Sequence, residues 1–498
     1  MAEPRTTQEH EPAPQDAAGG SGRRLRIVLT VTLVGVLVAL IAVLAAGFTT
    51  RQGSSGVIAP SPSGAASVLQ AATPNASSAT PNASSATPSG ASGPALIAAV
   101  DDSGALTTMN ESGGSVASYA VPGVVFGSPA WAPDGSRIAA IGSASDGTSL
   151  YVFPVRRGGP VGNGHPIVIY RSSDQPPFYL YWAPDSRKLA FLASEPVGLS
   201  LRIAPADGSA PLDGSGPGAI IRRGAPLYFD WVGADRLLLH VGSGASGFVG
   251  EVYVDGAAIA PAVAGTGDFR TASVSRDGQY LAYVRSEVGL AGEIVVASRG
   301  GASEHDLAVF GATAFAFDPT SDMLASIAAV KPVDGVPGFP VGPLRLIDAR
   351  SGSVRTLLDG SVIGFFWAPD GRTIAALRLP SPGGQTADLG PILRDTALAF
   401  PQAAATPPPG AEVRLAFVDV STGIVRSERV VQLASDFVSA LLPYFDQYAL
   451  SDRLWSPDSA SILLPLVDAS GRTRLVAVPA DDTDSRPIAD GVSGFWSP

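Results

Sequence analysis

The chain has 498 residues, of which 45% are hydrophobic, and its 57 glycines and 43 prolines are typical of a large, turn-rich globular protein. It has no cysteine, which excludes disulfides, thiolate nucleophiles and cysteine zinc sites. Residues 1–94 hold five arginines and four acidic residues, a net charge of +1, so the remaining residues carry −12 and the whole chain −11. This acidic part is not expected to bind nucleic acid.

The N-terminal part predicts a membrane anchor. Residues 1–24 are polar and lack periodicity, which indicates a disordered tail. Residues 25–48 are almost wholly apolar and long enough to cross a bilayer as a helix. Arg23, Arg24 and Arg26 stand at its N-terminal side, which predicts a cytoplasmic N-terminus and an extracytoplasmic remainder. A cleaved signal peptide and a buried core helix are the alternatives, and the apolar run is long for the first.

Residues 49–94 predict a disordered linker. They consist mainly of Ser, Ala, Pro, Thr and Gly, and the segment 73–79 repeats as 80–86. Asn75 and Asn82 match the pattern for N-glycosylation, but both come from this one duplication. A plain spacer is therefore the favoured interpretation.

The remainder, 95–498, repeats one turn motif. The clearest copies run Trp-(Ala/Ser)-Pro-Asp and start at Trp131, Trp182, Trp367 and Trp455; weaker copies start at Trp231, Val274 and Phe317, and a cut-off copy starts at Trp496. Proline sets φ for a tight turn, the aspartate side chain caps it, and the following glycine takes a left-handed conformation. Each copy therefore predicts a hairpin, and a period of about 40–50 residues is typical of four-stranded propeller blades.

These motifs resemble the WD-like repeats of the TolB-like β-propeller family, over 95–498. The resemblance implies an all-β propeller that serves as a platform for contacts with other proteins. It implies no particular function, because this platform is used for many tasks.

The ends of the repeat region are expected to complete one blade together. Strands are predicted at 95–100, 105–109 and 116–121, before the first tryptophan, and the last one is predicted at 494–496. Their union closes the ring and gives eight blades, or seven if the copy at Trp231 is not a full blade. The aromatic residues are then wedges between blades and the aspartates are turn residues, in the structural set Trp131, Asp134, Trp182, Asp185, Trp231, Trp367, Asp370, Trp455, Asp458 and Trp496.

Insertions give the best positional indication of a site. If the Pro-Asp turns join the first and second strands of each blade on one face, then residues 331–342, 380–411 and 434–453 project from the other face. The predicted partner-contact surface lies in the third: Phe437, Tyr444, Phe445, Tyr448, Asp436 and Asp446. The alternative is that these side chains pack the insertion onto the blades. Tyr179 and Tyr181 reach the same face, where strand packing is favoured.

The sequence lacks the catalytic motifs that were sought, namely a G-x-S-x-G elbow, a phosphate-binding loop and H-E-x-x-H. Its histidines outside the tail, at 165, 240 and 305, fall in separate blades, so neither a metal nor a cofactor is expected. We therefore expect a non-catalytic scaffold of the cell envelope that binds a protein, peptide or glycan. The alternative is a propeller enzyme (a lyase, glycosidase or peptidase relative) with a site on the axis.

Overall fold

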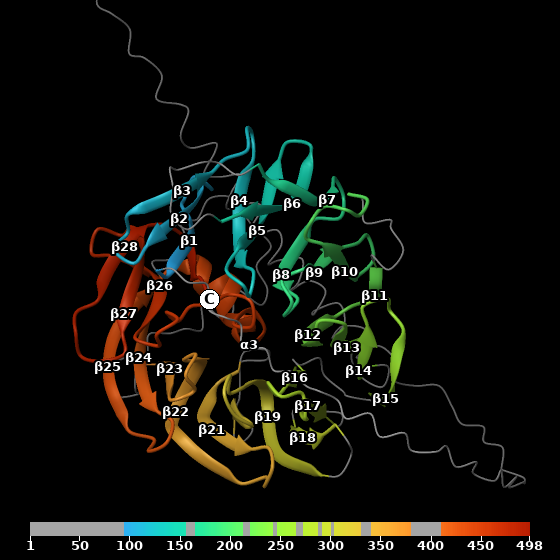
Figure 1. The fold of residues 1–498 in the computed structure, drawn as a ribbon. Helices are drawn as coiled ribbons and strands as arrows, with labels where there is room; N and C mark the ends of the chain where they lie inside the picture. Colours follow the sequence, from blue (N-terminus) through green and yellow to red (C-terminus); the bar gives the residue numbers. More distant parts are fainter. Residues whose placement is uncertain are drawn as a thin grey trace, which may run out of the picture.

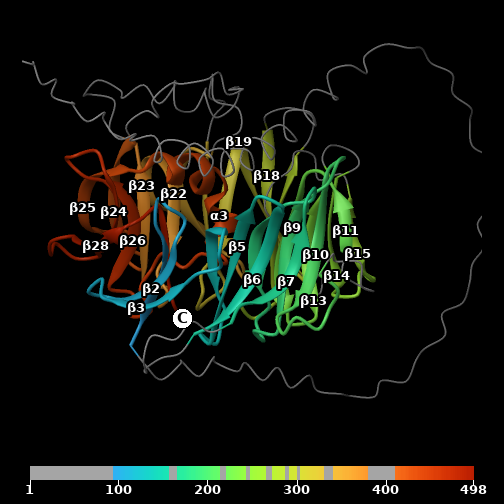
Figure 2. The same ribbon diagram turned by 90° about the horizontal axis from the view of Figure 1, so that it is seen from above.

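The protein is a β-propeller (Figure 1). The computed structural model describes residues 94–155, 165–212, 220–242, 247–264, 272–286, 291–299, 303–329, 340–379 and 410–498. The sheets follow one another around a ring and form a disc when viewed from the side (Figure 2). In these ranges no helix is long and apolar enough to cross a membrane. The predicted span 25–48 and the linker 49–94, apart from Pro94, lie outside them and stay predictions.

Four blades are separate antiparallel sheets. In hydrogen-bond order their strands are β29 (Ser493–Trp496), β1 (Leu96–Val100), β2 (Leu106–Asn110) and β3 (Ser115–Tyr119) in blade 1; β4 (Val125–Trp131), β5 (Arg137–Ala144), β6 (Gly147–Pro154) and β7 (Ile167–Ser172) in blade 2; β8 (Pro177–Trp182), β9 (Lys188–Ser194), β10 (Leu199–Pro205) and β11 (Ile220–Gly224) in blade 3; and β12 (Leu227–Gly233), β13 (Arg236–Val241), β14 (Phe248–Tyr253) and β15 (Ala258–Ala264) in blade 4.

The other strands form one continuous 13-stranded sheet, which we divide into four further blades. It is continuous because β19 (Glu304–Phe317) and β22 (Val354–Trp367) each run from the outer strand of one blade into the inner strand of the next, and because Leu433 pairs with Leu466. The remaining strands are β16 (Ser273–Val274), β17 (Tyr280–Ser286) and β18 (Ala291–Ser298) in blade 5; β20 (Met323–Ala329) and β21 (Gly342–Asp348) in blade 6; β23 (Thr373–Arg378), β24 (Ala411–Asp419) and β25 (Val425–Leu433) in blade 7; and β26 (Ser461–Val467), β27 (Thr473–Pro479) and β28 (Arg486–Asp490) in blade 8.

The two ends of the described chain share blade 1, as predicted. β29 pairs with β1 in the register Ile97↔Trp496 to Val100↔Ser493. Beyond this register the Leu96 amide donates to the Ser497 Oγ at 3.1 Å, and the Ser497 amide donates to the Leu96 carbonyl at 2.8 Å. Non-covalent pairing between residues about 400 positions apart therefore closes the ring.

The repeated turn has the predicted chemistry. The Oδ1 atom of Asp134 accepts the Ser136 amide at 2.9 Å, and Gly135 has a φ of 66°. Two copies carry serine in the glycine position, Ser186 and Ser459, each with a φ of 60°. Their hydroxyls accept a backbone amide of the preceding motif in sequence, that of Asp134 and that of Asp370, each at 3.1 Å. Serine thus offsets the strain of a left-handed backbone with a bond between blades.

The motif tryptophans are wedges between blades, as predicted. Five of them donate their indole N–H to the inner strand of the neighbouring blade, to the residue that precedes that blade's own motif aromatic. The acceptors are the carbonyls of Phe495 for Trp131, Ala130 for Trp182, Tyr181 for Trp231, Ala316 for Trp367 and Phe366 for Trp455, at 3.0–3.2 Å. The sixth, Trp496, is 1% exposed, and its Nε1 has no hydrogen-bond partner within the described part of the chain.

The two faces of the disc differ as expected from strand direction. The Pro-Asp turns, the start of β1 and the C-terminus lie on one face, which we call the turn face and which Figure 1 views. The connections β20–β21, β23–β24 and β25–Trp455 leave from the opposite face, which we call the loop face. Most of 331–342 and nearly all of 380–411 fall outside the described residues, whereas 434–453 is described throughout.

Candidate functional site on the propeller axis

The insertion 434–453 folds as three short helical turns inside the ring. They are a π-helix at Phe437–Leu441, a 3-10 turn at Leu442–Tyr444 and α3 at Phe445–Tyr448. α3 lies near the centre of the ring (Figure 1). None of these turns has a side-chain cap, and each is too short to be stable alone, so packing must hold them. We call 434–453 the axial segment.

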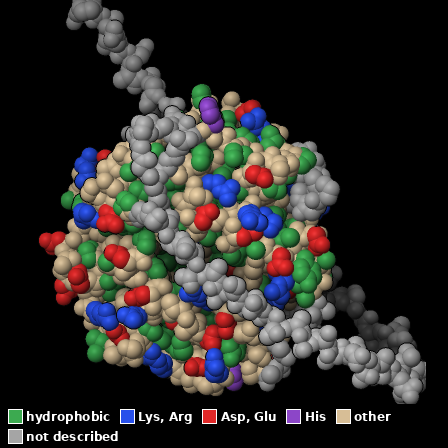
Figure 3. Space-filling view, in the orientation of Figure 1, with side chains coloured by type: hydrophobic (Ala, Val, Ile, Leu, Met, Phe, Trp, Pro, Cys, Tyr) green, Lys and Arg blue, Asp and Glu red, His purple; other side chains and the backbone are tan. Residues whose placement is uncertain are grey.

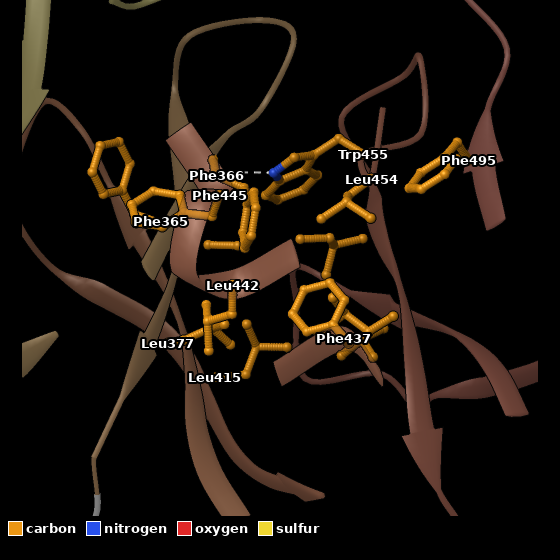
Figure 4. Close-up of a cluster of buried hydrophobic side chains, with 14 of the residues drawn as sticks. Phe365, Phe366, Leu377, Leu415, Phe437, Leu442, Phe445, Leu454, Trp455 and Phe495 are labelled. Carbon is orange, nitrogen blue, oxygen red and sulfur yellow. Dashed lines mark hydrogen bonds between the residues drawn. The ribbon is translucent and has the colours of Figure 1, made fainter. Parts of the chain in front are cut away.

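An apolar side of the axial segment packs on the inner strand of blade 7 (Figure 4). Phe445 is fully buried, and its ring meets the rings of Phe365 and Phe366 edge-on, with centroids 5.1 Å and 5.7 Å apart. A Cβ at Gly364 would lie 2.8 Å from Leu442, so glycine makes room for the segment. Burial of large apolar side chains, worth about 1.5–3 kcal/mol each, fixes the segment in the ring.

A tyrosine cluster joins the other side of the axial segment to blades 3 and 4. The Tyr179 hydroxyl donates to the Gln447 carbonyl at 3.0 Å, and its ring meets Tyr448 edge-on at 5.3 Å. Tyr179 is buried and has a φ of 47°, which is costly for a bulky side chain. A strained residue of the inner strand of blade 3 therefore holds the segment.

The predicted contact residues divide into three groups. Phe437, Phe445 and Asp446 are buried, Tyr444 and Tyr448 are half-buried, and Asp436 is exposed. For the two phenylalanines the packing alternative therefore describes the structure, because their rings face the blades and leave no surface for a partner. Partner binding stays a prediction for the outer edge of the segment, where Ser439 is also exposed.

Two carboxyl groups near the axis have strongly altered acidities. Burial raises the pKa of Asp230, on β12, to about 7, although the Val274 amide and the Tyr181 hydroxyl both bond to this carboxyl. Burial also raises the pKa of Asp452 to about 7, against a lowering effect of the Ser451 hydroxyl. Groups with such acidities can exchange protons near neutral pH, which is the property expected of a general acid or base.

Two further groups complete the cluster. The Tyr228 side chain is fully buried, and its hydroxyl has no hydrogen-bond partner among the described residues. Arg453 keeps an exposed surface although protein surrounds it on most sides, and the loss of solvation lowers the pKa of its guanidinium while the nearby Tyr181 opposes this. Nothing in the sequence around Tyr228, Asp230, Asp452 or Arg453 marks these residues, because three-dimensional closure alone brings them together.

The histidines do not join this cluster. His240 is buried on β13, His165 is exposed, and the half-buried His305 contacts the Arg350 carbonyl at 3.3 Å. Among the residues that the structure describes, no group of three or more His, Asp or Glu side chains is placed to hold a metal ion.

Comparisons with known proteins add only likenesses of fold. No family model matches the chain, and no curated protein matches it. Similar solved structures include a eukaryotic initiation factor (11% identity, 81% of this chain and 99% of that one, TM-score 0.48) and a prolyl endopeptidase (11% identity, 74% and 50%, TM-score 0.47). A TolB from Acinetobacter baumannii is also similar (16% identity, 52% and 64%, TM-score 0.32). At these levels of similarity they do not distinguish a scaffold from an enzyme.

Proposed function

We propose that this protein is a non-catalytic binding scaffold of the cell envelope, tethered to the membrane by residues 25–48 with its N-terminus in the cytoplasm. The propeller then stands outside the membrane on the linker 49–94. Its partner is a protein, a peptide or a glycan that docks on the loop face, where the axial segment forms the centre.

The packing of the axial segment carries this proposal. A loop that only connected two blades would not need to bury Phe437, Leu442 and Phe445 or to engage a strained tyrosine. These contacts hold the outer edge, with Asp436, Ser439 and Tyr444, in one fixed shape on the loop face. A rigid edge loses little conformational entropy on binding, which favours affinity.

The test is a crosslinking pull-down from membranes with the full chain. Deletion of 434–453 would expose the core of the ring, so the better variant is Ser439→Arg, which adds bulk and charge at an exposed position. Ser118→Arg is the matched control, because Ser118 is exposed on β3, the outer strand of blade 1. The proposal predicts that Ser439→Arg loses partners that Ser118→Arg retains. Identical partners for both variants would contradict the proposal that partners dock on the loop face.

A second candidate function has an observation of its own. Asp230 and Asp452, with pKa values near 7, are suited to proton transfer at an axial site. An enzyme of the lyase or glycosidase type would then use one as acid and the other as base. In that case the full chain should turn over peptides or uronate oligosaccharides, and Asp230→Asn or Asp452→Asn should abolish turnover. Turnover that survives both substitutions would rule out this site.

A further inference from the structure

Arg453, the last residue of the axial segment, places a positive charge inside the ring. Its carbonyl accepts the Trp496 amide at 2.8 Å, so it lies beside the closing strand β29. Blade 3 lies across the interior of the ring (Figure 1), and Tyr181 of its inner strand is close enough to act on the Arg453 guanidinium. The Arg453 side chain is exposed although protein surrounds it. It can therefore meet a ligand that enters the ring.

The Arg453 guanidinium has no counter-charge within the protein. None of the described carboxylates lies within ion-pair distance of it. Other arginines that are largely enclosed do have one: Arg202 pairs with Glu195 at 3.2 Å, and Arg299 pairs with Glu251 at 2.6 Å. A charge that loses much of its solvation without gaining a partner is unfavourable. A bound anion would supply the partner that Arg453 lacks.

The charges around Arg453 indicate which anion fits. The titratable groups that act on one another here form what we call the axial cluster: Tyr179, Tyr181, Tyr228, Asp230, Tyr444, Asp446, Tyr448, Asp452 and Arg453. This cluster contains one cation and three carboxyl groups, so it suits a single negative charge better than a doubly charged phosphate. A guanidinium also matches a carboxylate with two parallel hydrogen bonds.

Tyr181 connects the exposed arginine with a buried acid. Its hydroxyl bonds to the carboxyl group of Asp230, whose Oδ2 also accepts the Val274 amide at 3.3 Å. When Asp230 is neutral, its own O–H can donate to the Tyr181 oxygen, and the Tyr181 hydroxyl can then donate to an acceptor beside Arg453. Burial holds the Asp230 pKa at about 7, so this rearrangement is accessible near neutral pH.

We propose that Arg453 and Tyr181 bind a carboxylate group, and that Asp230 takes up a proton from solvent when the carboxylate binds. The carboxylate accepts from the guanidinium and from the Tyr181 hydroxyl, whose oxygen accepts from protonated Asp230. The carboxylate belongs either to a small free acid or to an acidic side chain of a partner. This site uses none of the exposed residues of the loop-face surface, so either can fail without the other.

Isothermal titration calorimetry of the full chain tests the binding site. The probes are acetate, as a free acid, and acetylated and amidated Gly-Glu-Gly, as a carboxylate side chain. Arg453→Gln should weaken saturable binding about tenfold or more, the loss of a charged hydrogen bond. Arg486→Gln is the matched control, because it removes the same charge from an exposed position on β28, the outer strand of blade 8.

The control should bind like the unaltered chain. The turn face mixes acidic and basic side chains over most of its area (Figure 3), so it offers no general attraction for anions. Tighter binding of the peptide than of acetate would support an acidic side chain of a partner, and equal binding would support a free acid. Equal affinities of Arg453→Gln and Arg486→Gln for both probes would overturn the proposal.

Titrations in buffers of different ionisation enthalpy measure the proton uptake. At pH 7 we expect about half a proton per bound carboxylate, because about half of the Asp230 groups are ionised before binding. Asp230→Asn should still bind, because its amide can donate to Tyr181, but it should keep only the smaller uptake that Asp452 contributes. Tyr181→Phe should lose the same share of uptake although Asp230 is present, which a purely packing role of Tyr181 would not cause. Binding without proton uptake, or the same uptake in both variants as in the unaltered chain, would overturn the coupling to Asp230.

Discussion

Replacement of single tryptophans by phenylalanine tests how the blades are joined. Trp131 and Trp496 occupy the same repeat position at adjacent seams of the ring, and they are 3% and 1% exposed. Only Trp131 donates its indole N–H, to the Phe495 carbonyl at 3.0 Å. Both substitutions remove the same volume, so the packing cost is similar and the hydrogen bond makes the difference.

The expected difference follows from the two hydrogen-bonding situations. Trp131→Phe leaves the buried Phe495 carbonyl without its indole partner, at a cost of about 1–3 kcal/mol. Trp496→Phe breaks no bond and removes a buried donor that has no acceptor in the described structure, which recovers a similar amount. We therefore expect Trp131→Phe to lower the free energy of unfolding by about 2 kcal/mol or more beyond Trp496→Phe.

Equilibrium unfolding in urea, followed by far-ultraviolet circular dichroism, measures this difference. The comparison is valid if both variants unfold in one transition with the same dependence on urea. The Trp131→Phe midpoint should lie clearly below that of Trp496→Phe. Equal midpoints would show that the indole–carbonyl bonds do not join the blades.

Three further predictions concern the axis and the turns. Burial raises the Asp230 pKa from 3.8 to about 7, so the folded chain keeps a proton that the unfolded chain releases. As the pH rises from 4 to 7, this group therefore lowers the free energy of unfolding by about 1.4 kcal/mol per pH unit. Asp230→Asn should make the unfolding midpoint depend less on pH over that window. Ser186→Ala and Ser186→Gly both lose the bond to the Asp134 amide, but only alanine keeps a side chain on a left-handed backbone. The free energy of unfolding of Ser186→Ala should therefore be about 1 kcal/mol below that of Ser186→Gly, and a lower value for glycine would contradict the turn analysis. Tyr179→Phe leaves the Gln447 carbonyl without the tyrosine hydroxyl, so limited proteolysis within 434–453 should quicken; an unchanged cleavage rate would mean that this bond does not hold the axial segment.

The repeat and its closure could be predicted because their determinants are local. A Pro-Asp-Gly turn depends on neighbouring φ angles and one side-chain cap, and these residues keep that chemistry wherever the hairpin lies. The pairing of β29 with β1 could be predicted because each end of the repeat region holds an incomplete blade. The C-terminal end has an inner strand without the three strands that normally follow it, and the N-terminal end has three such strands without an inner strand. Even the weak copy at Trp231 heads a complete sheet, because its inner strand is buried from Leu227 to Trp231 and, apart from Asp230, aliphatic or aromatic, although the turn that follows is degraded.

The axial site could not be predicted in the same way. Tyr179, Asp230 and Asp452 lie far apart in sequence and meet only because blades converge on an axis. The aromatic residues of 434–453 were expected at a surface, but the space inside a ring is a property of all its blades together, and this segment occupies part of it. The acidity of Asp230 and Asp452 arises from burial, which no local pattern encodes.

Closure of the ring can be measured directly with an engineered disulfide. The chain has no cysteine, so Val100→Cys with Ser493→Cys introduces the only pair, at positions that face each other across β1 and β29. Facing residues in antiparallel strands have Cα atoms about 4.5–5.5 Å apart, within the range that a disulfide spans. The closed ring predicts that mild oxidation of the full chain yields an intramolecular crosslink in nearly all molecules, seen as a shift in non-reducing electrophoresis. Free thiols that persist after oxidation, or crosslinks only between chains, would contradict the shared blade and the two-face arrangement built on it.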